Sequence, residues 1–254
     1  AVASRIQLSA LPTVRPPFSG CDDFGLSASM HPAKEVGGDF YDFFLIDQDH
    51  CGVVIADVSG KGVPAALFMM RVKALLNQLL REDLSPDQVL ARANDGLCED
   101  NEAGMFVTVW LGVLDLRSGK LVYANGGHNP PLYRHADGSV EWMRDRSGLL
   151  LGSFEGVPYR VFERTMIRGD SLILYTDGVT EAMDASDHCY GDERLFQLVE
   201  RECDGYPASV SGVIEEDVRA FAEGADQADD ITLLVLRYDG QENGPAASAA
   251  GNRG

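Results

Sequence analysis

The order of the expected strands and helices constrains the fold of this chain more than any other feature. Apolar periodicity and Gly/Pro punctuation indicate two strands, two helices, a run of strands, two more helices and one last strand. The expected strands cover 39–46, 51–58, 105–116, 120–125, 139–145, 159–167, 171–176 and 231–238, and the helices cover 60–80, 86–97, 192–202 and 207–223. Clustered strands with separated helix pairs favour layers over alternating βαβ units. We therefore predict an α+β fold, a four-layer αββα sandwich with two antiparallel sheets flanked by helix pairs.

Local signals support several of these elements. Pro64 suits the first turn of the helix over 60–80, because a residue there needs no backbone N–H donor. Ser85 and Gln88 form a capping-box pattern around Pro86, which predicts a helix start at that point. The segment 117–119, Arg-Ser-Gly, is typical of a tight hairpin turn between two strands.

The length of 254 residues is sufficient for one large domain or two small ones. Three prolines in the segment LPTVRPPFSG indicate that residues 1–20 are a lead-in or linker. We expect one catalytic domain over residues 21–239 and a disordered tail over residues 240–254. We also expect the chain to be part of a longer protein, whose upstream part could carry a sensor region or a membrane anchor.

Charge and cysteine usage exclude several classes of partner. The formal net charge is −19, from 40 acidic and 21 basic residues, so the surface repels nucleic acid and anionic lipid headgroups. We expect no nucleic-acid partner and no direct membrane contact by this chain. Its five cysteines include no Cys-x-x-Cys pair, which favours free thiols in a reducing compartment and predicts a cytoplasmic location.

Aspartates stand at the ends of several expected strands. They are Asp39, Asp57, Asp177, Asp229 and Asp230. If those strand ends meet, the carboxylates raise each other's pKa values unless a cation lies between them. Hard oxygen ligands suit Mg²⁺ or Mn²⁺, and a bridging Asp57 could hold two ions about 3.5–4 Å apart. A single strand-end aspartate is more often a turn former or a helix cap, and a single calcium-binding turn is a further alternative, although its D-x-[DN]-x-[DN]-G pattern is absent.

Six segments of the chain occur in the order that is typical of the metal-dependent, PPM-type serine/threonine protein phosphatases. They are EVGGDFYDFF, VVIADVSGKGVPAALFM, MFVTVWLGVLD, YANGGHNPPLY, LILYTDGVTEAMD and DDITLLVLRY. The chain resembles the bacterial branch that contains the sporulation phosphatase and the RsbU-like sigma-factor regulators, over roughly residues 30–238. The resemblance implies a β-sandwich flanked by helix pairs, in agreement with the layers predicted above.

The resemblance also implies a centre of two Mn²⁺ or Mg²⁺ ions that activates a water, with no side-chain nucleophile. The implied ligand positions are Asp39, Asp57, Val58 through its carbonyl, Asp177, Asp229 and Asp230. Asp57 would bridge the two ions, and Asp39 with Val58 would complete one of them. Asp177 and Asp229 would hold the other ion, while Asp230 takes the place of an adjacent polar residue.

Two positions depart from the pattern of animal and plant relatives. Lys34 stands where those relatives have a phosphate-binding arginine, so it is either a phosphate contact or a solvated lysine. Ser59 stands where they have a histidine proposed as general acid, which leaves the proton donor to the leaving group unassigned.

We expect His128 to be structural in its Gly/Pro-rich turn. Lys61 is expected beside the metal site without binding a nucleotide, because the Walker pattern is absent.

The resemblance implies a phosphoserine/phosphothreonine phosphatase acting on a small STAS-type anti-sigma-factor antagonist or a similar partner-switching protein. One alternative is a catalytically degenerate module of the same fold that only docks a partner. A second alternative is a phosphodiesterase or nucleotidase that uses similar two-metal chemistry.

Overall fold

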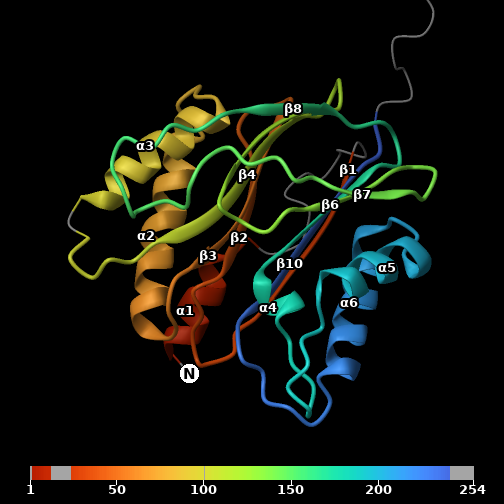
Figure 1. The fold of residues 1–254 in the computed structure, drawn as a ribbon. Helices are drawn as coiled ribbons and strands as arrows, with labels where there is room; N and C mark the ends of the chain where they lie inside the picture. The colour runs from red at the N-terminus through yellow and green to blue at the C-terminus, as the bar shows by residue number, and fades with distance from the viewer. Residues whose placement is uncertain (1, 13–23, 100, 241–254) are drawn as a thin grey trace, which may run out of the picture.

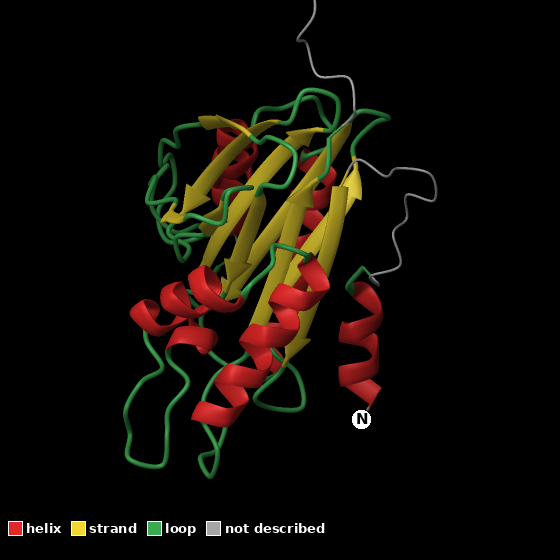
Figure 2. Ribbon diagram, turned by 90° about the vertical axis from the view of Figure 1, so that its right-hand side faces the viewer, coloured by secondary structure: helices red, strands yellow, loops and turns green. Residues whose placement is uncertain are grey.

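A computed structural model describes residues 2–12, 24–99 and 101–240. In these ranges two five-stranded sheets are stacked in the middle of the molecule, with helices on the outside (Figures 1 and 2). The helices are α1 (Val2–Ala10), α2 (Val63–Leu79), α3 (Pro86–Cys98), α4 (Asp177–Thr180), α5 (Asp192–Glu202) and α6 (Pro207–Phe221). The strands are β1 (Phe24–His31), β2 (Phe40–Leu45), β3 (His50–Val58), β4 (Val107–Asp115), β5 (Lys120–Gly126), β6 (Leu132–Arg134), β7 (Val140–Trp142), β8 (Phe162–Thr165), β9 (Ser171–Tyr175) and β10 (Ile231–Tyr238).

The two sheets differ in how the chain builds them. The first, called the β3 sheet, has the strand order β2-β3-β4-β5-β8 and is mostly made of consecutive strands. The second, the β10 sheet, has the order β1-β10-β9-β6-β7, so the last strand lies next to the first. All strand pairs are antiparallel. The predicted α+β sandwich of two antiparallel sheets is confirmed.

Side-chain alternation in β9 shows how the layers are held together. Leu172 and Leu174 belong to the large core between the sheets, while Ile173 and Tyr175 pack in a second cluster with residues of α5 and α6 such as Leu195. Period-two alternation is expected of a strand whose two faces both meet apolar layers. The α2 and α3 side chains join the large core with the β3 sheet, so each sheet carries one helix pair.

The α3 start follows the predicted capping chemistry. The Ser85 N–H donates to Gln88 Oε1 at 3.2 Å, and Pro86 occupies the first turn. Pro64 likewise lies in the first turn of α2. These local interactions fix where the helices begin and therefore which face each turns to the sheet.

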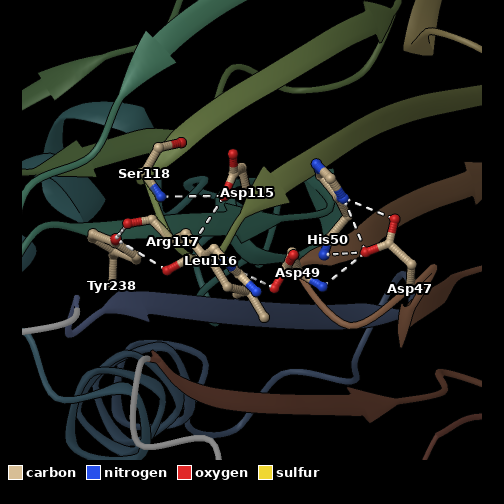
Figure 3. A network of polar contacts seen from close by, with 8 residues as sticks. All are labelled: Asp47, Asp49, His50, Asp115, Leu116, Arg117, Ser118 and Tyr238. Atoms are coloured by element: carbon tan, nitrogen blue, oxygen red, sulfur yellow. Dashed lines mark hydrogen bonds and ion pairs between the residues drawn. The ribbon is translucent and has the colours of Figure 1, made fainter.

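Turns close one end of the β3 sheet through aspartate side chains (Figure 3). Asp47 Oδ1 accepts the N–H groups of Asp49 and His50 at 2.8 and 2.9 Å in the β2–β3 turn. Asp115 accepts the Arg117 N–H at 2.9 Å in the β4–β5 turn, and Arg117 Nε donates to Asp49 Oδ1 at 2.6 Å. These carboxylates are used as turn acceptors, so this end of β3 is structural.

Four elements were not predicted, namely α1, β1 and the short elements β6 and α4. Residues 2–10 of the predicted 1–20 lead-in form helix α1, whose Gln7 Nε2 donates to the Gly37 carbonyl at 2.6 Å. Strand β1 was not predicted, because small and polar residues dominate Phe24–His31. Residues 13–20 and 241–254 lie outside the described residues. Within the described ranges, none of the helices has the length and apolar composition that a membrane span requires.

Candidate metal centre

The predicted ligand positions come from both sheets and from the same end of the sandwich. From the β3 sheet they are Asp39, directly before β2, and Asp57 and Val58 at the end of β3; from the β10 sheet they are Asp177, two residues after β9, and Asp229 and Asp230, directly before β10. This end lies opposite the turn network at the start of β3. The site is therefore divided between two layers that are far apart in the sequence.

The pKa values show that the carboxylates lie close together. Burial raises the pKa of Asp57 to about 7, with further increases from the charges of Asp177, Asp229 and Asp230 and a decrease from a hydrogen bond with Asp39. Burial, and then the charge of Asp57, raise the pKa of Asp39 well above its ordinary value. Like charges held this close oppose each other's ionisation, and a cation between them would relieve that repulsion.

The pKa of Asp177, at the β10 sheet, is also raised. Burial raises its pKa, followed by the charges of Glu181 and Asp229. The Gly178 N–H and the charge of Lys61 act in the opposite direction. The charges of Asp177 and Asp229, from the β10 sheet, thus reach Asp57 in the β3 sheet.

Asp39 is held from the β10 sheet by two hydroxyl groups that were not among the predicted site residues. Thr176 Oγ1 and Thr232 Oγ1 each donate to Asp39 Oδ2 at 2.7 Å, and the Thr232 N–H donates to Thr176 Oγ1 at 3.0 Å. Both threonines continue the inward-facing rows of β9 and β10, the same rows as Leu174 and Leu234. The sequence held one sign of this role: each threonine lies two residues from an inward-facing leucine, so its hydroxyl also faces inward.

Asp230 has a different environment from its neighbour Asp229. Its Oδ1 accepts the Ala33 N–H at 2.8 Å and its Oδ2 accepts the Gly38 N–H at 2.7 Å. A Cβ on Gly37 would lie 2.2 Å from Asp230 Oδ2, so the glycine permits this close approach. Both carboxylate oxygens thus hold the loop that leads into Asp39.

The two lysines of interest lie in different environments. Lys61 Nζ is 2.8 Å from Asp229 Oδ2 and donates to the Ala228 carbonyl at 2.6 Å. Lys34 is exposed, and within the described residues no hydrogen bond or ion pair joins it to the aspartates. The structure brings Lys61 to the candidate ligands and leaves Lys34 at the surface.

Ser59 and His128 both tie strands together. Ser59 Oγ accepts the Phe106 N–H at 3.0 Å, next to the start of β4. His128 Nδ1 lies 2.8 Å from Thr108 Oγ1, and Thr108 is the register partner of Asp57. Burial lowers the pKa of His128 to about 4, so the ring is neutral near pH 7. The structure agrees with a structural histidine and not with a proton-donating one.

The donor set fits a divalent cation in its chemistry. The side-chain donors are all carboxylate oxygens, as Mg²⁺ and Mn²⁺ prefer. In the described part of the chain, no three His, Cys, Asp or Glu side chains are already grouped so that they could hold an ion. In the structure Asp229 instead contacts Lys61, and Asp39 contacts two threonines.

Comparison with known proteins identifies the family. The model of the stage II sporulation protein E (SpoIIE) family matches residues 47–239. The chain belongs to this family. It is a PP2C-type domain, the same type that the resemblance in the sequence predicted, and its enzyme class is protein serine/threonine phosphatase.

Individual relatives agree with this assignment. Phosphoserine phosphatase RsbU of Bacillus subtilis is 29% identical over 93% of this chain and 69% of its own length. The structure of the SiaA-PP2C domain of Pseudomonas aeruginosa superposes with a TM-score of 0.82 at 22% identity, over 94% of this chain and 95% of that domain. The catalytic domain of the phosphatase PstP, solved with 2 manganese ions, has a TM-score of 0.59 at 16% identity, over 84% and 97% of the two chains. Across the curated relatives it matches, this chain spans 38% to 69% of their length.

Proposed function

We propose that this domain uses two divalent cations to remove phosphate from phosphoserine or phosphothreonine in a small partner-switching protein. The observation that carries the proposal is the meeting of buried aspartates from both sheets at one end of the sandwich, where the charges of Asp177 and Asp229 raise the pKa of Asp57 and the charge of Asp57 raises the pKa of Asp39. A turn or helix-cap role for each aspartate alone would not bring together residues from both sheets.

Particular residues would hold the two ions, which are Mn²⁺ or Mg²⁺. Asp57 would bridge them, Asp39 and the Val58 carbonyl would complete one, and Asp177 and Asp229 would complete the other. When bound, two such ions neutralise the carboxylates and the phosphate and activate a water for in-line attack on phosphorus. No side chain of the protein would need to act as nucleophile.

Other residues of the chain would position these ligands. Thr176 and Thr232 fix one oxygen of Asp39 and leave the carboxylate no freedom to turn away from Asp57. Asp230 was predicted as a ligand, and its two contacts with backbone N–H groups support a positioning role for it instead. Asp230 would hold the loop that precedes Asp39.

The phosphate of the substrate would be contacted by a lysine here, where some relatives use an arginine. Lys34 is the candidate, since it follows Ala33, whose N–H is bonded to Asp230, and its side chain is exposed beside that loop. A lysine offers a point charge without the planar fork of arginine. The neutral ring of His128 argues against it as the acid that protonates the leaving oxygen.

The substrate we propose is a phosphorylated STAS-type anti-sigma-factor antagonist or a similar partner-switching protein. The support is the similarity to phosphoserine phosphatase RsbU over most of this chain. We propose a cytoplasmic location for the domain, with no nucleic-acid partner and no direct membrane contact. An upstream sensor region in the full-length protein would supply the activating signal.

Turnover of a generic aryl phosphate and of a phosphoserine STAS-type protein, with Mn²⁺ and then with EDTA, tests this proposal. We expect both to be hydrolysed with Mn²⁺ only. Asp177→Asn should abolish turnover, whereas the control Asp137→Asn, in the exposed β6–β7 turn, should not. Activity that persists in EDTA would reject the metal mechanism. Tight binding of the phosphoprotein without turnover would favour the docking module, and preferential hydrolysis of nucleotides would favour the nucleotidase.

A further inference from the structure

Lys61 lies on a short loop between a candidate ligand and a helix. The loop leads from Asp57 and Val58 at the end of β3 to the start of α2, and glycines flank the lysine on both sides. Gly60 and Gly62 have φ values of 83° and 77°, in the left-handed region that glycine adopts readily. This backbone directs the Lys61 side chain across the site toward the other sheet, where Asp229 and Ala228 lie.

The contact with Asp229 uses an oxygen that a cation would need. Lys61 Nζ is 2.8 Å from Asp229 Oδ2, and their side chains are 39% and 33% exposed. Asp39 is held by neutral hydroxyl groups and Asp230 by backbone N–H groups, neither of which carries a full positive charge. Among the residues that the structure describes, Lys61 is the one basic side chain paired with any of the five aspartates.

We propose that Lys61 is a built-in competitor of the divalent cation for Asp229, and that it sets the affinity of the Asp177–Asp229 half of the centre. The ammonium and the cation cannot both occupy the same face of Asp229 Oδ2, so ion binding has to displace the lysine. This inference rests on the proposed function, since it assumes that Asp229 is a metal ligand.

The second contact of Lys61 suggests how the displacement could be reversible. Its Nζ also donates to the Ala228 carbonyl at 2.6 Å, and this oxygen remains available when Asp229 turns to an ion. The lysine would then stay close to the centre and return when the ion leaves. A purely structural tether between the α2 loop and the β10 start is the competing explanation for the same contacts.

Calorimetric titration with Mn²⁺ distinguishes these explanations, because it measures ion binding without turnover. Lys61→Met removes the charge and keeps the apolar stem, and we expect one of the two Mn²⁺ sites to tighten about fivefold, which corresponds to about 1 kcal/mol for an exposed ion pair. Lys61→Arg keeps the charge and should retain the wild-type affinity. Lys120→Met changes the net charge equally at the far end of β5, where Lys120 pairs with Glu163, and should also change nothing.

An Asp229→Asn background separates competition from simple repulsion. If Lys61 acts by occupying Asp229, the Lys61→Met substitution will have no effect in that background. Equal tightening in both backgrounds would overturn the proposal, because repulsion through space does not need the Asp229 carboxylate. Unchanged Mn²⁺ affinity of Lys61→Met with a lowered Tm would also overturn it and establish the structural tether. A wild-type protein that binds no Mn²⁺ would refute the proposed function itself, whereas normal wild-type binding with an unaltered Lys61→Met affinity would refute only this inference.

Discussion

Asp229 and Asp230 are adjacent in the chain, and substituting each in turn tests whether they have the different roles that their contacts indicate. Asp230 is buried and accepts two backbone N–H groups, from Ala33 and Gly38. Asp229 is half-buried and pairs with Lys61. We expect Asp230→Ala to lower stability and Asp229→Asn to lower metal binding.

The size of the stability loss follows from the donors that Asp230→Ala leaves without an acceptor. A buried donor left unpaired costs about 1–3 kcal/mol, so two of them predict a loss of about 2–6 kcal/mol of unfolding free energy. Removing a negative charge near Asp39 and Asp57 offsets part of this loss, which places the expectation near the lower end. Asp229→Asn loses only an exposed ion pair, for which about 0–1 kcal/mol is expected.

Urea denaturation in EDTA is the assay, since it removes any contribution of a bound ion. Asp230→Asn is an intermediate variant, because its amide keeps one acceptor oxygen and should lose about half as much stability as the alanine. Equal stability of Asp229→Asn and Asp230→Ala would refute the reasoning. So would an Asp230→Ala protein with wild-type stability and no Mn²⁺ binding, since that pattern belongs to a ligand.

Three further predictions follow from the structure. Saturating Mn²⁺ should raise the Tm, because a ligand at 100 times its Kd adds about 2.7 kcal/mol of stability, and EDTA should cancel the rise in a thermal scan. Gln7→Ala should cost about 1–3 kcal/mol in urea unfolding, because the buried Gly37 N–H loses its 3.1 Å contact with Gln7 Oε1, whereas a cost below experimental error would show that α1 does not support this loop. His128 has a folded pKa of about 4, below its ordinary value of 6.5, so its contribution to stability is complete above pH 6.5 and is lost as pH falls toward 4. Between those pH values the wild type should lose about 3 kcal/mol more unfolding free energy than His128→Asn does. Parallel curves of stability against pH for the two proteins would contradict this.

Much of the fold could be predicted because its elements carry their own signals. The α3 start is encoded by Ser85 and Gln88 within four residues, and β10 by the apolar run Leu233–Leu236. β1 has no such signal, since it is an edge strand held to β10 by backbone pairing that depends little on its side chains. The position of α1 depends on Gln7 and Gly37, which are 30 residues apart.

The sequence allowed the acidic residues of the candidate site to be predicted, but not the contacts that these residues make. Aspartates at the ends of apolar strands are visible in the sequence, because strand ends are where a sandwich can present ligands. The contact of Lys61 Nζ with the Ala228 carbonyl joins residues 167 apart, and the contact of Asp230 with the Gly38 N–H joins residues 192 apart. Sequence spacing carries no information on such contacts, which arise only when the two sheets are stacked.

The division of the aspartates between the sheets affects when a growing or damaged chain can become active. Asp39 and Asp57 leave the ribosome before Asp229, which precedes β10, the last strand of the sandwich. If Asp229 is a ligand as proposed, a nascent chain or a proteolytic fragment that ends before this strand would hold only part of the ligand set. Catalysis would then have to wait until synthesis of the domain is nearly complete, and unfinished or cleaved copies would not dephosphorylate a target.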